Sequence, residues 1–162
     1  MLAGLQAGAM GLPFMPVRGI IGTDYMQIRP DFKVIDNPYG EDKIVVVPAI
    51  VPDIALIHAK KADSSGNVLV DRFENDPLLA RASKRVFVSC EEMVPNVYEV
   101  FTKEDIIIPS IYINKVVLLP GSARPTGCEG YYDLDDEAIR AYLKAAKDDA
   151  SMFEYMDVFI NR

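Results

Sequence analysis

Short apolar segments that end in polar turns recur along the first two thirds of the chain. The β-branched run at residues 43–48 (KIVVVP) predicts a strand. Residues 54–59 form a second apolar run, which predicts a strand buried on both faces, as in a parallel or mixed sheet covered by helices. Shorter strands are predicted over residues 68–70, 85–90 and 115–119, and residues 105–108 form a further apolar segment.

Helical patterns alternate with these strands. Residues 2–10 have near-helical spacing of apolar positions, and Pro13 ends this segment because proline cannot continue a helix. Asp76 and Pro77 are typical of a helix start, and this helix is expected to run through Ala82. A helical turn is predicted over residues 91–94, and longer helices over residues 137–147 and 151–159. Alternating strands and helices indicate the α/β class, with an open mixed or parallel sheet and flanking helices.

The chain has 162 residues, half of them hydrophobic, and a formal net charge of −7. This length predicts a single domain, residues 1–162, of ordinary globular composition. The acidic balance argues against nucleic acid as a partner, because phosphates require clustered Lys and Arg. No apolar run reaches the roughly 18–20 residues of a membrane helix, and the first residues do not resemble a signal peptide. Two cysteines without paired spacing, Cys90 and Cys128, favour a reduced, cytoplasmic protein.

Conventional active-site signatures are absent from the sequence. The one histidine, His58, excludes a His-rich metal cluster, and the cysteines lack zinc spacing, so no metal site is expected. A Ser-His-Asp relay would have to use His58, and neither a Gly-x-Ser-x-Gly elbow nor a phosphate-binding loop is present. Within its apolar strand, His58 is most simply a partly buried, hydrogen-bonded histidine.

Residues 13–42 contain many Pro and Gly residues and are too irregular for long elements; loops of this length in compact domains are often functional. The candidate substrate-binding residues of this segment are Arg18, Gly19, Gly22, Thr23 and Asp24. Glycines let backbone N–H groups approach an anionic or carbonyl oxygen closely, and Arg18 could grip a carboxylate bidentately. The alternative is that Arg18 pairs with a structural carboxylate.

Two further segments follow strand ends. Residues 63–67 lie at the carboxyl end of a strand, where open α/β sheets bind ligands, although turn chemistry alone also explains them. Glu129 lies among small residues of the loop 120–132 and is a further candidate, either as an accessible catalytic carboxylate or as a solvated loop residue. Glu91 and Glu92 are interpreted as first-turn acids of the short helix predicted there.

Four longer stretches, together with the helix-strand-Glu-Glu passage that ends at Val94, suggest a family, and the second and third of the four are the specific ones. The four stretches are GLPFMPVRGIIGTD (residues 11–24), RPDFKVIDNPYG (29–40), VPAIVPDIALIHAKKADSSGNV (47–68) and PGSARPTGCEGYYDLDD (120–136). In this order they resemble the alpha (A) subunit of family I CoA-transferases of the glutaconate CoA-transferase type, over nearly the whole chain. The resemblance begins partway along the family's usual sequence, so it implies the C-terminal portion of such a subunit, with Rossmann-like layers.

The resemblance implies a reaction that transfers CoA from an acyl-CoA to a carboxylic acid. CoA is then a substrate, and no cofactor is expected. In two-subunit members, the glutamate that attacks the thioester belongs to a homologous B subunit, so no residue of this chain is assigned a catalytic role. A hetero-oligomer of the α2β2 type is implied. Two alternatives remain open: a CoA-ester hydrolase subunit, in which Glu129 or another carboxylate activates water, and a fragment that associates without catalysis.

Overall fold

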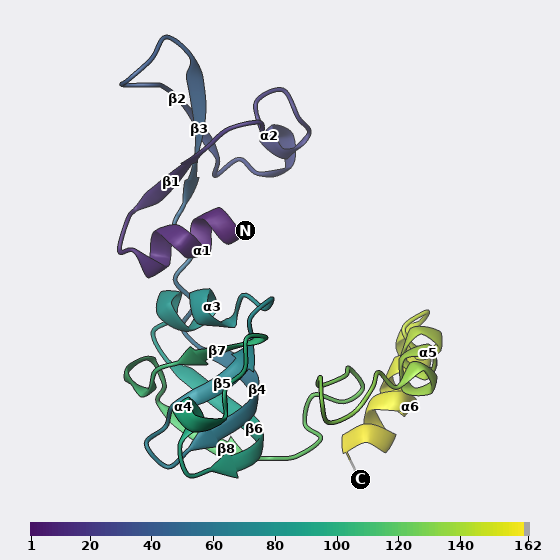
Figure 1. Ribbon diagram of the computed structural model, residues 1–162. Helices are drawn as coiled ribbons and strands as arrows, with labels where there is room; N and C mark the ends of the chain where they lie inside the picture. Colours follow the sequence, from purple (N-terminus) through teal and green to yellow (C-terminus); the bar gives the residue numbers. More distant parts are fainter. Residues whose placement is uncertain (161–162) are drawn as a thin grey trace.

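The computed structural model describes residues 1–160 and contains two β-sheets, with helices α1 and α3 between them (Figure 1). The strands are β1 (Phe14–Val17), β2 (Lys33–Asp36), β3 (Lys43–Pro48), β4 (Ala55–Asp63), β5 (Val68–Asp71), β6 (Val86–Val94), β7 (Asp105–Ile108) and β8 (Lys115–Leu118). The helices are α1 (Leu2–Ala9), α2 (Tyr25–Ile28), α3 (Asp76–Ala82), α4 (Val97–Val100), α5 (Asp136–Ala145) and α6 (Asp149–Ile160), with a 3-10 turn at Ser110–Tyr112. Arg162, the predicted end of the domain, lies outside the described residues.

A three-stranded antiparallel sheet, with the order β1-β3-β2, forms the N-terminal part. β3 confirms the strand predicted at residues 43–48, and its central position explains why Val45, Val46 and Val47 are buried. β1, α2 and β2 are short elements within the irregular segment 13–42. Both edges of β3 are therefore paired within the chain.

The second sheet has five strands in the order β7-β5-β4-β6-β8. β4, β6 and β8 are parallel to one another, whereas β5 and β7 run antiparallel to their neighbours. This mixed sheet with flanking helices confirms the predicted α/β class. The parallel register places His58 of β4 directly beside Ser89 of β6.

One face of the five-stranded sheet packs into the main apolar core. Ala55, Ile57 and Ala59 of β4 belong to it, together with Val88 of β6. Ala80 of α3 contributes from the other side of this core, and α1 packs against α3 (Figure 1). Of these two helices, α3 is the one that packs on this face of the sheet, and the opposite face carries the polar side chains described below.

The prediction that residues 54–59 are buried on both faces is wrong. Leu56 is 78% exposed, although it lies between two buried residues. His58 and Lys60 lie on the same side of β4 as Leu56, because side chains alternate along a strand. β4 therefore has one apolar face and one largely polar face.

The helical turn predicted over residues 91–94 is also wrong. β6 continues as a strand through Val94, because it stays paired with the parallel strand β4 to its end. The short helix α4 begins only at Val97. Glu91 and Glu92 are strand residues, not first-turn acids of a helix.

The remaining predicted elements are present. α3 matches the helix expected from Asp76 to Ala82, and the C-terminal helices α5 and α6 correspond to those predicted over residues 137–147 and 151–159. α5 and α6 pack as a pair that stands apart from the sheet in Figure 1, with the rings of Tyr142 and Tyr155 in edge contact. Within residues 1–160, no helix has the length and apolarity needed to cross a membrane.

Candidate functional site

The polar face of the β4–β6 pair carries a connected group of side chains. His58 Nδ1 lies 2.8 Å from Ser89 Oγ, and His58 Nε2 lies 2.7 Å from Glu91 Oε1. Ser89 and Glu91 are two residues apart on β6, so both point to the face on which His58 lies. The parallel register of the two strands therefore assembles the group.

The loop 120–132 folds back onto this face and is held there mainly by Glu91. The backbone N–H of Gly121 donates to both carboxylate oxygens of Glu91 at 2.9 Å, and Tyr132 Oη donates to Oε1 at 2.6 Å. Tyr131 Oη donates to the neighbouring Glu92 at 3.1 Å. Two acids of β6 thus help to hold the loop on this face.

Ser122 brings a second hydroxyl to the histidine. Its Oγ lies 3.0 Å from His58 Nδ1 and 3.0 Å from Ser89 Oγ. Ser122 is exposed, whereas the side chains of His58 and Glu91 are 18% and 4% exposed. The result is a chain of groups that runs from a solvent-accessible hydroxyl to a buried carboxylate.

The ionisation of Glu91 follows from its contacts. Burial alone would raise the pKa of this carboxyl, but hydrogen bonds from Tyr132, Gly121 and His58 outweigh burial and hold its pKa below the usual range. Burial and the bond to Glu91 raise the pKa of Tyr132. Because Glu91 is an anion that only accepts, His58 Nε2 donates a proton to it. In the neutral ring, Nδ1 is then the nitrogen that can accept a hydrogen bond from one of the two neighbouring hydroxyls.

Lys60 forms a second charged cluster on the same face. Its Nζ lies 3.0 Å from Asp105, 3.2 Å from Glu129 and 3.5 Å from Asp71. Burial would lower the pKa of the ammonium group, but the three carboxylates outweigh burial and raise it. Lys60 therefore stays charged and connects β4 with β5, β7 and the loop 120–132.

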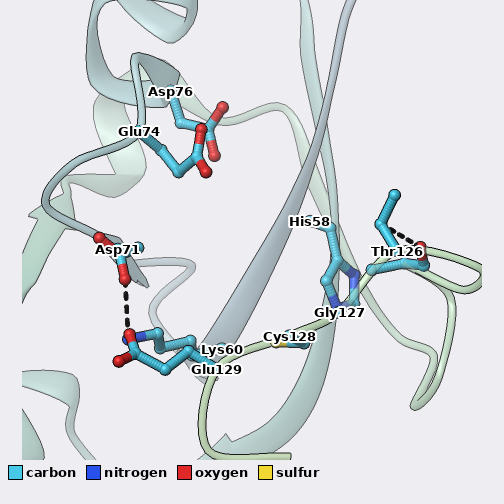
Figure 2. A pocket seen from close by; sticks show the side chains of 10 residues that line it. His58, Lys60, Asp71, Glu74, Asp76, Thr126, Gly127, Cys128 and Glu129 are labelled. Carbon is cyan, nitrogen blue, oxygen red and sulfur yellow. Dashed lines mark hydrogen bonds and ion pairs between the residues drawn. The ribbon is translucent and has the colours of Figure 1, made fainter. Parts of the chain in front are cut away.

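A cavity of about 370 Å³ lies between these two clusters and the start of α3. Figure 2 shows Glu74 and Asp76 on one side of it, and His58, Thr126 and Gly127 on another. Burial and the nearby Glu74 raise the pKa of Asp76, with His58 acting weakly in the opposite direction. Acids outnumber bases along the lining, so the cavity disfavours phosphates and other anions.

One group of side chains has the atom types of a metal site. His58, Glu91 and Cys128 each bring one ligand atom within 4.8 Å of the others. Nitrogen, oxygen and thiolate ligands of this kind suit zinc. However, Glu91 already accepts hydrogen bonds from three partners, and burial raises the pKa of the Cys128 thiol, which opposes the thiolate. These contacts favour a hydrogen-bonded network over a metal centre.

The candidate residues of segment 13–42 lie in a different part of the molecule, beside the three-stranded sheet (Figure 1). Arg18 pairs with Asp42 at 3.2 Å, and its side chain is 76% exposed. Gly19 and Gly22 have φ values of 83° and 80°, a region that L side chains rarely adopt, so both turns require glycine. Thr23 closes one turn by donating from its hydroxyl to a backbone carbonyl.

Asp24 immediately precedes α2, and its side chain forms no capping bond there. Neither Asp24 nor Arg18 contacts the His58 group or Glu129 among the described residues. The structure brings Glu129 to Lys60 at the cavity, and keeps the Arg18 loop with its own sheet. The candidate residues predicted from the sequence thus lie in two separate locations, the Arg18 loop and the cavity beside Lys60.

The turn at residues 63–67 is held together by its own side chains. Asp63, only 4% exposed, accepts from the backbone N–H groups of Ser65, Asn67 and Val97. Burial would raise the pKa of Asp63, but a hydrogen bond from the Asn67 side chain and the three backbone bonds outweigh burial and lower it. Asp63 therefore fastens α4 to the end of β4, which supports the turn-chemistry interpretation over a ligand site.

Comparison with known proteins agrees with this architecture. The family model described as Coenzyme A transferase matches residues 1–119, which include both sheets. The chain therefore belongs to the coenzyme A transferase family.

Individual relatives narrow the resemblance to A subunits. The chain is 37% identical to the A subunit of glutaconate CoA-transferase from Acidaminococcus fermentans, over 88% of this chain and 50% of that one. The crystal structure of glutaconate coenzyme A-transferase from the same organism superposes with a TM-score of 0.84 at 30% identity, over 96% of this chain and 55% of that one. The A subunit of 3-oxoadipate CoA-transferase from Pseudomonas knackmussii is 32% identical, over 95% of this chain and 54% of its own.

The solved structure of a protein with a different activity, a decarboxylase, is also similar to this chain. The decarboxylase AibA/AibB superposes with a TM-score of 0.82 at 32% identity, over 99% of this chain and 58% of that one. The chain spans about half the length of the curated transferase subunits that it matches. The resemblance to a family I A subunit, stated from the sequence, is confirmed.

Proposed function

We propose that this chain is part of the A subunit of a two-subunit CoA-transferase, which moves CoA from an acyl-CoA to a carboxylic acid. The observation that carries this proposal is the family match across both sheets. The nucleophilic glutamate belongs to a homologous B subunit, and this chain supplies substrate-facing loops and part of the shared interface. Covalent catalysis then divides one exchange into an acyl anhydride step and an enzyme–CoA thioester step.

The Arg18 loop is our candidate for the site of the acceptor carboxylate. Arg18 is exposed and pairs with Asp42, a carboxylate that an acceptor could displace from the guanidinium. Gly19 and Gly22 have positive φ values, and turns with this backbone conformation can present N–H groups to an anion. Thr23 and Asp24 shape the turn that presents them.

CoA itself is the second substrate, and its phosphates need donors or positive charge. The cavity beside His58 is lined by Asp71, Glu74, Asp76 and Glu129 against the single ammonium group of Lys60. An acidic lining repels phosphate groups. We therefore propose that the phosphates of CoA bind elsewhere on the protein. Glu129 remains a candidate substrate-binding residue in the loop 120–132.

The test is CoA exchange in a complex of this chain with a B subunit produced together with it. Labelled CoA should move from an acyl-CoA to acetate or a dicarboxylate only when both subunits are present. Hydroxylamine or borohydride should trap the enzyme thioester on a B-subunit glutamate, and never on this chain. A complex that forms but shows no exchange over a panel of acceptors would contradict the proposal.

The same assay addresses the hydrolase alternative. Release of free CoA by the complex without any acceptor, at a rate equal to that with acceptor, would indicate hydrolysis instead of transfer. The 162-residue chain alone should transfer no CoA, because the glutamate that carries CoA belongs to the B subunit.

We further propose a cytoplasmic location, since the free cysteines Cys90 and Cys128 suit a reducing compartment.

A further inference from the structure

The group formed by Ser122, His58 and Glu91 has the arrangement of a nucleophile, its base and the carboxylate that orients the base. Ser122 Oγ lies 3.0 Å from His58 Nδ1, and His58 Nε2 lies 2.7 Å from Glu91. Both distances are within the range for proton transfer along hydrogen bonds. The sequence has no nucleophile-elbow motif, so the arrangement arises only from the loop folding back onto the sheet.

The exposure of the three side chains follows the order that such chemistry requires. The hydroxyl that must reach a substrate is on an exposed residue, the base is 18% exposed, and the carboxylate is 4% exposed. The serine bonds Nδ1 and the carboxylate bonds Nε2, so the two ring nitrogens have exchanged the roles they have in serine proteases. Either ring nitrogen can act as the acceptor once the other one carries the proton.

We propose that Ser122 is a reactive nucleophile that accepts an acyl group from small esters or thioesters and releases it to water, with His58 as base and Glu91 as the residue that orients His58. This activity goes beyond CoA transfer and does not depend on the B-subunit glutamate. It belongs to this chain alone, so its test and that of the transferase can fail separately.

The chemical step is balanced without any further reagent. Ser122 Oγ attacks the acyl carbon while its proton passes to His58 Nδ1, directly or through Ser89 Oγ at 2.8 Å. Collapse of the tetrahedral intermediate breaks the bond to the leaving alkoxide or thiolate, which takes the proton from His58. A water molecule then attacks the acyl-serine in the same way, and the products are a carboxylic acid and free Ser122.

Fastening the loop does not by itself require the Ser122 hydroxyl. Gly121, Tyr131 and Tyr132 already attach the loop to the two acids of β6. Glu129 attaches it to Lys60. The Ser122 hydroxyl adds one exposed hydrogen-bonding group to a loop that the β6 acids and Lys60 already hold. Removing this hydroxyl should therefore leave the loop in place.

The surroundings of Ser122 predict both the rate of turnover and the charge of the acyl group that is accepted. The backbone N–H groups of Gly121 and Ala123 already donate to Glu91 and Tyr132, so they are not free to stabilise an oxyanion, and turnover should be slow. The adjacent cavity, lined by His58, Ala123 and several acids, should accept a neutral acyl group and repel an anionic one.

The test is covalent labelling of the 162-residue chain by a fluorophosphonate probe, with the modified serine located by peptide mapping. One label per chain is expected, on Ser122. Ser122→Ala should abolish labelling, and the control Ser64→Ala, at an exposed turn serine, should not change it. His58→Gln should slow labelling about a hundredfold, the usual contribution of a general base, with an unchanged circular dichroism spectrum.

Two further outcomes decide the proposal. With 4-nitrophenyl acetate, the chain should release a burst of one equivalent of 4-nitrophenol. This burst should be faster than with the 4-nitrophenyl ester of succinate, whose acyl group is anionic. Equal burst rates would overturn the predicted preference for neutral acyl groups. A folded chain that takes no label, or one labelled at another serine, would show that the network only fastens the loop.

Discussion

His58 and Glu91 are joined by a 2.7 Å hydrogen bond across two parallel strands, although they are 33 residues apart in the sequence. Each also contacts the loop 120–132, His58 through Ser122 and Glu91 through Gly121. One pair of side chains thus couples the sheet to the loop that covers it. Because Glu91 makes the bonds to the loop backbone, a change at Glu91 should be detectable both in the stability of the fold and in the position of the loop.

Glu91→Gln should destabilise the chain by about 1.5–3 kcal/mol, the range for losing hydrogen bonds to a buried charged group. The amide of glutamine would present donors to Tyr132 and to the N–H of Gly121, which are donors themselves. Chemical denaturation at one fixed protein concentration measures the difference. The exposed Glu41 offers a matched control, and Glu41→Gln should stay within about 0.5 kcal/mol of the unchanged chain.

The same carboxylate should make stability depend on acidic pH. The folded pKa of Glu91 lies below its ordinary value of 4.5, so its contribution is complete above that value and is lost as the pH falls through the folded pKa. The unchanged chain should therefore lose stability more steeply below about pH 4.5 than Glu91→Gln does. Parallel slopes for the two proteins between about pH 5 and pH 3 would assign the acid sensitivity to other groups.

Asp63→Asn should loosen the junction between β4 and α4. Asp63 accepts from the N–H groups of Ser65, Asn67 and Val97, and an amide of the same shape offers one acceptor oxygen in place of two. A loss of about 1–3 kcal/mol is expected, the cost of an unsatisfied buried polar group. Hydrogen exchange should show the loss of protection at the Val97 amide. Ser64→Ala, in the same turn, serves as the control with no expected effect.

Local patterns in the sequence predict most elements of the fold. The β-branched run at residues 43–48 and the helix opened by Asp76 are defined by neighbouring residues, which a sequence displays directly. The full length of β4 and β6 is different, because polar residues such as Lys60 and Glu91 interrupt the apolar pattern. Pairing between two parallel strands keeps these segments extended, and it joins residues such as His58 and Ser89 that are 31 positions apart.

The candidate site can be predicted only in part. Glu129 follows from loop chemistry, and the structure brings it to Lys60. Ser89 and Glu91 alternate on a strand, but two adjacent acids after an apolar run also fit the first turn of a helix, so the local pattern does not distinguish the two. Ser122 joins them only because its loop folds back over the sheet, and no local pattern indicates that contact.

In the complex with a B subunit, Arg18→Ala should raise KM for the acceptor carboxylate more than KM for the CoA ester. A lost charge-assisted bidentate contact corresponds to about a tenfold to hundredfold change. Asp42→Asn is the matched variant, because it frees Arg18 from its ion pair without removing the guanidinium, and should lower KM for the acceptor or leave it unchanged. Unchanged kinetics with reduced thermal stability in Arg18→Ala would assign Arg18 to structure.

The chain should not be a monomer in solution. Among the residues that the structure describes, β8 is an edge strand that pairs only with β6, and Val117 and Leu118 on it are about half exposed. Leu56 on β4, separated from β8 by β6, is 78% exposed, so apolar side chains are uncovered both at this edge and on the sheet near it. Such an edge favours pairing with another chain, whether a second copy or the B subunit.

Sedimentation at micromolar concentration measures this association directly. Val117→Lys should weaken it, because a charged side chain opposes pairing at a strand edge. Tyr39→Ser, at an exposed residue of the turn between β2 and β3, is the control and should not change it. A stable 18.0 kDa species that unfolds cooperatively would contradict the prediction, because the edge of β8 and the Leu56 side of the sheet would then be stable in water without a partner.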